Sequence, residues 1–97
     1  AGILPYPENP GKFQRLFEKQ NQWVVGYNAA KGKSEYVKRV TVTLPFLRAE
    51  VDCGVAYATG SRKRRAVRLV VSKRGSLEKT PARILREMSN ITLFVDQ

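Results

Sequence analysis

A chain of 97 residues with 42% hydrophobic residues suits one domain with a modest core, which argues against disorder throughout. Lysine and arginine number 18 against 8 acidic residues, and the net charge of +10 far exceeds what solubility requires. This excess predicts an acidic partner, with nucleic acid first and an anionic membrane or an acidic protein second. A single cysteine excludes an internal disulfide, so an intracellular setting, cytoplasmic or organellar, is expected.

The N-terminal segment is rich in proline and leads into a helix signal. Residues 1–10 are predicted to form an extended arm in front of a single basic α+β domain over 11–97. Asn9-Pro10 has the residue types of a helix start, with asparagine as the cap and proline in the first turn. Apolar residues at helical spacing then predict a short amphipathic helix over about residues 10–20.

Beyond this helix, apolar residues alternate with polar ones, and this alternation predicts β-strands. The predicted strands cover residues 23–27, 36–46, 49–57, 67–71 and 91–95. A second helix is expected to begin at Pro81, since proline favours the first turn of a helix. The order α-β-β-β-β-α-β predicts an α+β fold, in which a small, mostly antiparallel sheet of four to five strands carries two short helices on one face.

The alternation also assigns side chains to the two faces of the predicted sheet. In the long second strand, Val40 and Val42 fall on the apolar face, and Thr41 falls on the other. Tyr36 and Tyr57 also fall on the apolar faces of their strands, which favours packing in the core over stacking on unpaired bases. The tyrosines are therefore expected to serve the core.

Four consecutive cations stand between the predicted third and fourth strands, in the run Gly60-Ser61-Arg62-Lys63-Arg64-Arg65. Like charges this close repel one another unless a polyanion lies across them and releases its counterions. The run is interpreted as the tip of a β-hairpin that grips phosphates, and the alternative is a solvated loop that only keeps the protein soluble. The candidate nucleic-acid-binding residues are this cluster, one cation on the next strand and a second basic group leading onto the second helix: Arg62, Lys63, Arg64, Arg65, Arg68, Lys73, Arg74, Lys79, Arg83 and Arg86.

No catalytic residue, metal site or cofactor is predicted. Because the chain has no histidine, it lacks the usual proton shuttle near neutral pH. Cys53 falls on the apolar face of a predicted strand, where a buried, inert thiol is the default. Glu50 and Asp52 share one face of that strand and could hold a metal, but Arg48 and Arg68 nearby favour cross-strand charge pairing.

The leading hypothesis is a non-catalytic RNA-binding protein, a structural component of a ribonucleoprotein such as a ribosome. Basic surfaces and extended arms suit binding that positions the partner rather than reads its bases. RNA is favoured over DNA as the partner, although phosphate contacts alone serve both. No membrane partner is expected, because no apolar run approaches the roughly twenty residues of a spanning helix and neither predicted helix is long and lysine-rich on one face.

The alternative hypothesis is a basic linker that assembles acidic proteins. Over residues 66–95 the predicted order is strand, helix, strand, and the helix carries the sequence Arg83-Ile84-Leu85-Arg86, with Ile91 opening the last strand. This part of the chain resembles the small linker domain of phycobilisomes, in which a basic strand–helix–strand contains an Arg-Ile-x-Arg helix. The family's glycine pair after the helix is replaced by Ser89-Asn90, and the first two thirds of the chain do not match. The resemblance implies binding to acidic protein surfaces.

Overall fold

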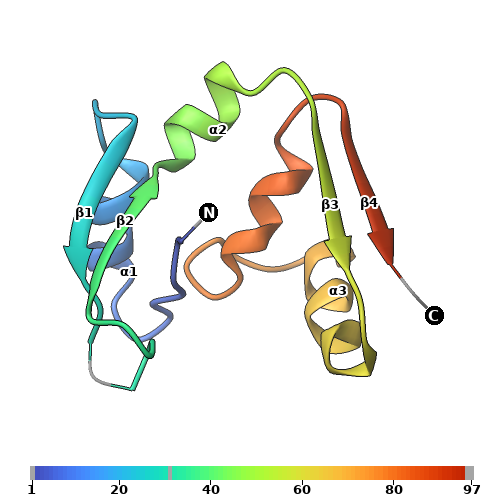
Figure 1. The fold of residues 1–97 in the computed structure, drawn as a ribbon, viewed down its shortest axis with the longest axis horizontal. Coiled ribbons are helices and arrows are strands. Elements are labelled where there is room, and N and C mark those ends of the chain that lie inside the picture. Colours follow the sequence, from blue (N-terminus) through green and yellow to red (C-terminus); the bar gives the residue numbers. More distant parts are fainter. Residues whose placement is uncertain (1, 31, 96–97) are drawn as a thin grey trace.

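The structure, a computed structural model, describes residues 2–30 and 32–95. Its elements in chain order are α1 (Pro10–Phe13), η1 (Gln14–Glu18), β1 (Val24–Asn28), β2 (Lys38–Val42), α2 (Leu44–Glu50), β3 (Gly54–Ala58), η2 (Ser61–Lys63), α3 (Arg64–Val71), η3 (Pro81–Arg86) and β4 (Ile91–Val95). The segment η1 is a π-helical turn that continues α1, whereas η2 and η3 are 3-10 helices. Figure 1 shows the first four elements on the left and β3, α3 and β4 on the right, with α2 connecting the two sides.

The first helix begins where the sequence predicts. The Asn9 side chain accepts a hydrogen bond of 3.1 Å from the backbone N–H of Lys12, and Pro10 occupies the first turn. The helical segment ends at Glu18, so the prediction of a helix over about residues 10–20 is confirmed. It buries Phe13 and Phe17 completely, which makes its apolar stripe part of the core.

The strands form two separate two-stranded sheets, so the predicted sheet of four to five mostly antiparallel strands is wrong. Strands β1 and β2 pair antiparallel, whereas β3 and β4 pair parallel. Residues 67–71, which alternation predicts to be a strand, lie in α3, because their valines at positions 67, 70 and 71 also fit a helical spacing. In place of an antiparallel neighbour, β3 therefore has a helical crossover that leads to β4.

The predicted long second strand ends early because a helix starts inside it. The Thr43 hydroxyl accepts a hydrogen bond from the backbone N–H of Phe46 and caps α2, and Pro45 lies in the first turn of that helix. Since α2 occupies residues 44–50, the predicted third strand shrinks to β3. Cys53 precedes β3 as an exposed free thiol rather than a buried one.

The faces of β2 are the reverse of those that the alternation predicts. Thr41 is only 5% exposed, whereas Val40 is 73% exposed. Burial of threonine is tolerated because its hydroxyl is satisfied: Oγ1 of Thr41 accepts a hydrogen bond of 2.9 Å from the backbone N–H of Gly2. The N-terminal arm thus covers the inner face of the first sheet, and Tyr27 on β1 donates a hydrogen bond of 2.5 Å to the Gly2 carbonyl.

The core lies mainly in the N-terminal half of the chain. Phe17 packs edge-on against Phe13 and Tyr27, with ring centroids 5.3 and 5.0 Å apart. The buried cluster consists of Tyr6, Phe13, Phe17, Tyr27, Ala29, Leu44 and Ile84. Ile84, on η3, is the member of this cluster that comes from the C-terminal half.

Arg48 on α2 connects the two sides of the molecule by charge. It forms a bidentate ion pair with Glu18 at the end of η1, and its Nε lies 3.0 Å from a carboxylate oxygen of Glu87 after η3. These two carboxylates raise the pKa of Arg48 above its usual value, with Glu18 as the larger cause. The predicted cross-strand pairing of Arg48 and Arg68 with Glu50 and Asp52 is therefore wrong.

Candidate nucleic-acid interface

The basic run lies at the start of a helix and not at a hairpin tip, so the hairpin prediction is wrong. After β3, Gly60 adopts a φ of 89°, which lets the chain turn sharply away from the strand direction. Arg62 and Lys63 then lie in η2, and Arg64 opens α3. Because residues 67–71 are helical, β3 has no antiparallel partner after the basic run and no hairpin forms there.

Five cations of this segment form what we call the α3 basic face: Arg62, Lys63, Arg64, Arg65 and Arg68. All five are exposed. Arg64 and Arg68 are four residues apart and Arg65 and Arg68 are three apart, so these cations are neighbours along the helix. Among residues 2–30 and 32–95, no acidic side chain forms an ion pair with any of them.

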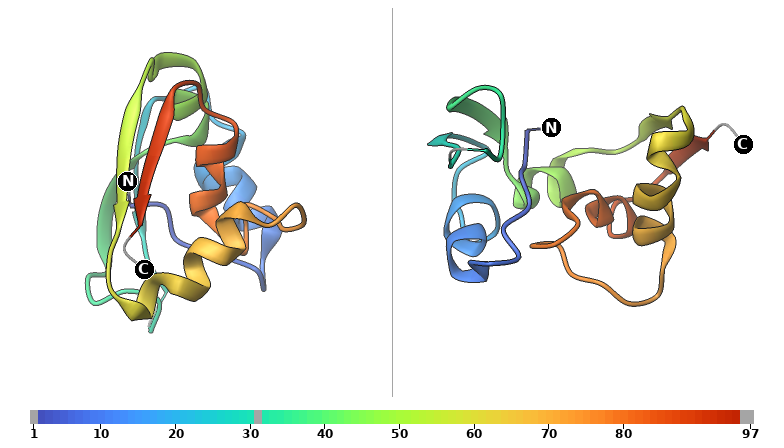
Figure 2. Two further views of the ribbon diagram at one scale, coloured as in Figure 1. Left: turned by 90° about the vertical axis from the view of Figure 1, so that its right-hand side faces the viewer. Right: turned by 90° about the horizontal axis from the view of Figure 1, so that it is seen from below.

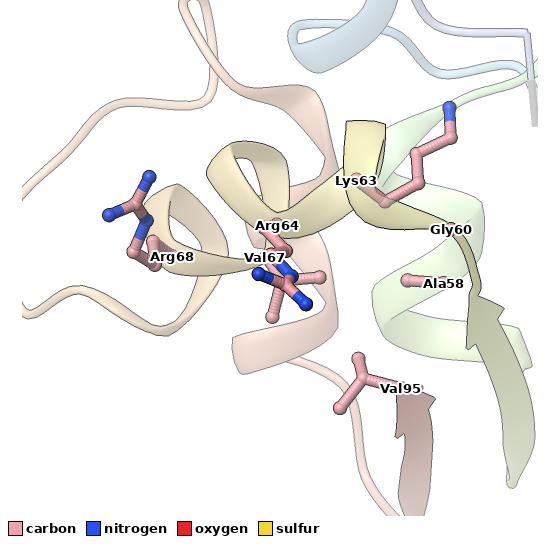
Figure 3. Close-up of a pocket in the computed structure, with 7 residues that line it drawn as sticks. All are labelled: Ala58, Gly60, Lys63, Arg64, Val67, Arg68 and Val95. Carbon is pink, nitrogen blue, oxygen red and sulfur yellow. The ribbon is translucent and has the colours of Figure 1, made fainter. Parts of the chain in front are cut away.

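A hollow of about 540 Å³ lies beside the α3 basic face, between α3 and the carboxyl ends of β3 and β4. It is lined by Ala58, Gly60, Lys63, Arg64, Val67, Arg68 and Val95. In Figure 3 the side chains of Arg64 and Val67 extend from α3 toward the side of Val95, whereas Lys63 and Arg68 point away from it. The hollow therefore combines apolar walls with cationic groups at its border.

Two of the predicted contact residues hold α3 in place. Arg83 is buried, and its guanidinium donates hydrogen bonds of 2.5 and 2.8 Å to the carbonyls of Leu69 and Ser72. Arg86 donates one of 3.0 Å to the carbonyl of Val71. These carbonyls belong to the last turn of α3 and to its C-cap residue Ser72, and cations are favoured at that end of the helix dipole.

The close approach to Arg83 explains a glycine in the loop that follows α3. Gly75 has a φ of 154°, and a Cβ added there would lie 2.9 Å from the guanidinium carbon of Arg83. Any larger residue would therefore push the buried arginine away from the helix carbonyls. Lys73 and Arg74 in the same loop are exposed, as is Lys79 farther along.

The ten predicted residues thus separate into an outward and an inward set. The α3 basic face and the loop cations Lys73 and Arg74 lie at the two ends of one helix, which at 1.5 Å per residue is about 12 Å long. Arg83 and Arg86 point at the carbonyl end of that helix instead. The outward-facing cations are therefore spread along α3 and the loop after it, and Lys79 lies farther along the chain.

The chain matches no protein-family model, no curated protein and no solved structure. The phycobilisome linker resemblance needs a basic strand over residues 66–72, but residues 66–71 are helical in this structure. In the part of the chain that the structure describes, no three histidine, cysteine, aspartate or glutamate side chains are grouped to hold a metal ion. Over the same residues, no helix has the length and apolar character to cross a membrane. What the α3 basic face binds is therefore inferred from its own chemistry.

The exposure of one pair of aromatic side chains was not predicted from the sequence. Tyr57 on β3 is 74% exposed and Phe94 on β4 is 51% exposed, although Tyr57 was predicted to pack in the core. The prediction fails because it assumed a sheet wide enough to be covered, whereas β3 and β4 form a ribbon of two strands. The sequence contains one weak indication of this exposure. Phe94 lies between Leu93 and Val95, so in a strand its side chain points to the opposite face from theirs.

Proposed function

We propose that the protein is a non-catalytic RNA-binding protein, a structural component of a ribonucleoprotein, that holds phosphates on the α3 basic face. The observation that carries this proposal is the placement of five exposed cations on one helical segment with no acidic partner among the described residues. Arginine dominates the set, and its planar guanidinium can hold a phosphate with two parallel hydrogen bonds.

The position of these cations on the helix is costly for the isolated protein. Arg64 and Arg65 lie in the first turn of α3, where the helix dipole favours acidic residues, and that turn contains none. Arg68 adds repulsion with both at spacings of four and three residues. Together these effects cost about 1–2 kcal/mol of helix stability. A polyanion on this face removes both penalties, because it screens the repulsion and complements the positive end of the dipole.

Binding of this kind is insensitive to base sequence and sensitive to salt. Each phosphate neutralised releases counterions, so the logarithm of the binding constant falls linearly with the logarithm of salt concentration. The contacts position the partner rather than read it. DNA phosphates can make these contacts equally well, so a DNA strand of the same length as the RNA is included in the test.

A pair of charge-matched variants tests the proposal. The first replaces Arg62, Arg65 and Arg68 with glutamine, which removes three charges and keeps a good helix former in α3. The second replaces three cations of the other half, Arg15, Lys19 and Lys38, which are also exposed. For both variants, fluorescence anisotropy measures binding to single-stranded RNA and to a DNA strand of the same length from about 50 to about 300 mM salt, a roughly sixfold range.

We expect the first variant to lose about 2 units of salt slope, since each phosphate contact to a single strand contributes about 0.7. The second variant should keep nearly all of the slope. Equal losses in the two variants would show that only net charge matters, and unchanged binding in the first would overturn the proposed interface. Binding of an acidic protein in preference to RNA would favour the linker hypothesis instead.

A further inference from the structure

The outer face of the β3–β4 ribbon carries two aromatic rings that are both open to solvent. Tyr57 and Phe94 are direct partners in the parallel register. Their rings are stacked, with centroids 5.3 Å apart and planes inclined by 18°. Val55, two residues earlier on the same face, is 61% exposed. The pair thus forms an exposed aromatic stack with one free face on each ring.

This exposure is unusual for a parallel sheet. Parallel strands are commonly covered by helices on both faces. Both views of Figure 2 show α3 and η3 on one side of β3 and β4, with no described segment against the other side. Large aromatic side chains are among the most effective groups for burying apolar area. Two of them left on the open face therefore mark a surface that a partner covers.

We propose that Tyr57 and Phe94 form a stacking platform for unpaired bases of the same RNA strand whose phosphates lie on the α3 basic face. This inference rests on the proposed function, and it specifies the substrate as single-stranded. A base has a flat π-face that extends an existing aromatic stack, and base–aromatic stacking tolerates any sequence. In a duplex the bases are already stacked on one another and offer no free face.

The position of the rings along the chain supports this occupant. Tyr57 is the second-last residue of β3 and Phe94 the second-last residue of β4. Both rings therefore lie near the carboxyl end of the ribbon, where the chain turns at Gly60 into η2 and α3. An RNA strand that stacks a base on the rings needs to cross only this turn to bring its phosphates to Arg62. Charge complementarity thus selects an anionic chain, and the flat rings select bases.

A protein or lipid partner fits the same surface less well. An apolar protein patch would place its own polar rim beside the five cations of the α3 basic face. An anionic lipid surface would require apolar residues on the same helix as the cations to enter the bilayer. Val70 of α3 is buried and Val67 lines the hollow, which leaves Leu69 and Val71 as the two large apolar side chains that this helix could offer to a bilayer.

The test compares ring removal with ring conservation. Tyr57→Ala and Phe94→Ala should each weaken binding to a 12-nucleotide oligouridine by about tenfold or more, as expected for one lost base stack. Tyr57→Phe keeps the aromatic face and should bind like the parent protein. All three variants should keep the salt slope, and none should change binding to an RNA duplex of equal length. Because both rings are more than half exposed and lose only the contact between them, the urea midpoint should fall only slightly, which confirms folding.

The outcomes separate the two proposals. If the alanine variants bind oligouridine as tightly as the parent while the charge variant of the α3 basic face loses its salt slope, stacking is overturned and the RNA-binding proposal stands. If the charge variant also binds unchanged, the RNA-binding proposal itself fails. Equal weakening for oligouridine and duplex would also overturn the stacking platform, because a duplex offers no unpaired base.

Discussion

The two halves of this molecule are held together by different forces. In the N-terminal half Tyr6, Phe13 and Phe17 are almost completely buried and pack ring against ring. In the C-terminal half the large apolar side chains on the outer sheet face are exposed, and α3 is held by arginine hydrogen bonds to its last carbonyls. The first half resembles an ordinary core, whereas the second relies on polar contacts around one helix.

This division separates stability from recognition. Burial of large aromatic residues contributes most of the stability that a small domain can gain. The proposed binding groups, the α3 basic face and the Tyr57–Phe94 pair, both lie in the half with little core of its own. Regions with few buried apolar contacts open at low free-energy cost, which suits a surface that adapts to a flexible strand. Four substitutions test this division.

The largest effect is expected in the aromatic core. Phe17→Ala should lower the free energy of unfolding by about 3–5 kcal/mol, because Phe17 is fully buried between Phe13 and Tyr27. Val70→Ala, at the buried side of α3, should cost about 1–2 kcal/mol because the smaller side chain leaves a smaller cavity. Urea unfolding followed by fluorescence of Trp23 measures both, and Phe17→Leu provides a milder variant. Equal losses at Phe17 and Val70 would contradict the division.

The second prediction concerns the polar support of α3. Arg83→Met keeps an unbranched side chain but leaves the carbonyls of Leu69 and Ser72 without their donor, at a cost of about 2–3 kcal/mol. Amide hydrogen exchange should rise in α3 and leave the N-terminal half protected. Lys73→Met, an exposed neighbour, serves as the control with the same loss of charge. If exchange in α3 stayed as slow as in the parent, Arg83 would not be its support.

The third prediction tests the link between the halves. Arg48→Met removes the ion pairs with Glu18 and Glu87 and should cost about 1–2 kcal/mol, since the three side chains are partly exposed and solvent weakens the pairs. The loss should shrink at 1 M salt because salt screens the parent's ion pairs. Unfolding curves of parent and variant at 0.1 and 1 M salt measure this difference, and a salt-independent loss would refute the ionic link.

The sequence predicts those elements that carry their own start signal. Asn9 and Pro10 mark the first helix, Pro81 marks the start of η3, and the first and last strands lie within a residue of the expected positions. Each of these signals is local, because a cap or a proline acts on the adjacent turn. Elements that depend on distant contacts were predicted less well.

The failures occur where two local patterns compete. Residues 67–71 fit both a strand and a helix, and the structure selects the helix, whose last carbonyls receive donors from Arg83 and Arg86 more than ten residues away. At Thr43 the alternation of apolar and polar residues predicts that the strand continues. The sequence Thr-Leu-Pro is also a helix-cap signal, and in the structure it opens α2. The cationic run is visible in the sequence. The burial of the Arg83 side chain and the exposure of the Tyr57 side chain depend on tertiary packing and are not.

The smallest effect is expected at the edge of the core, from the ionisation of Tyr27. Burial raises the pKa of the Tyr27 phenol and outweighs the opposing charge of Arg39. The folded state therefore favours the neutral phenol, whose contribution to stability is present below the unfolded pKa of about 10 and is lost as the pH rises through the folded pKa.

Tyr27→Phe should cost about 1 kcal/mol at neutral pH, because it loses the hydrogen bond to the Gly2 carbonyl. Above about pH 10 the gap between parent and variant should narrow, since only the parent loses stability by ionising this phenol. Urea midpoints from pH 8 to 11 measure the gap. Tyr36→Phe, at an exposed position, serves as the control. A gap that stayed constant at Tyr27 would mean that the arm leaves this ring open to water, and the N-terminal half would then be less well packed than its buried aromatic residues indicate.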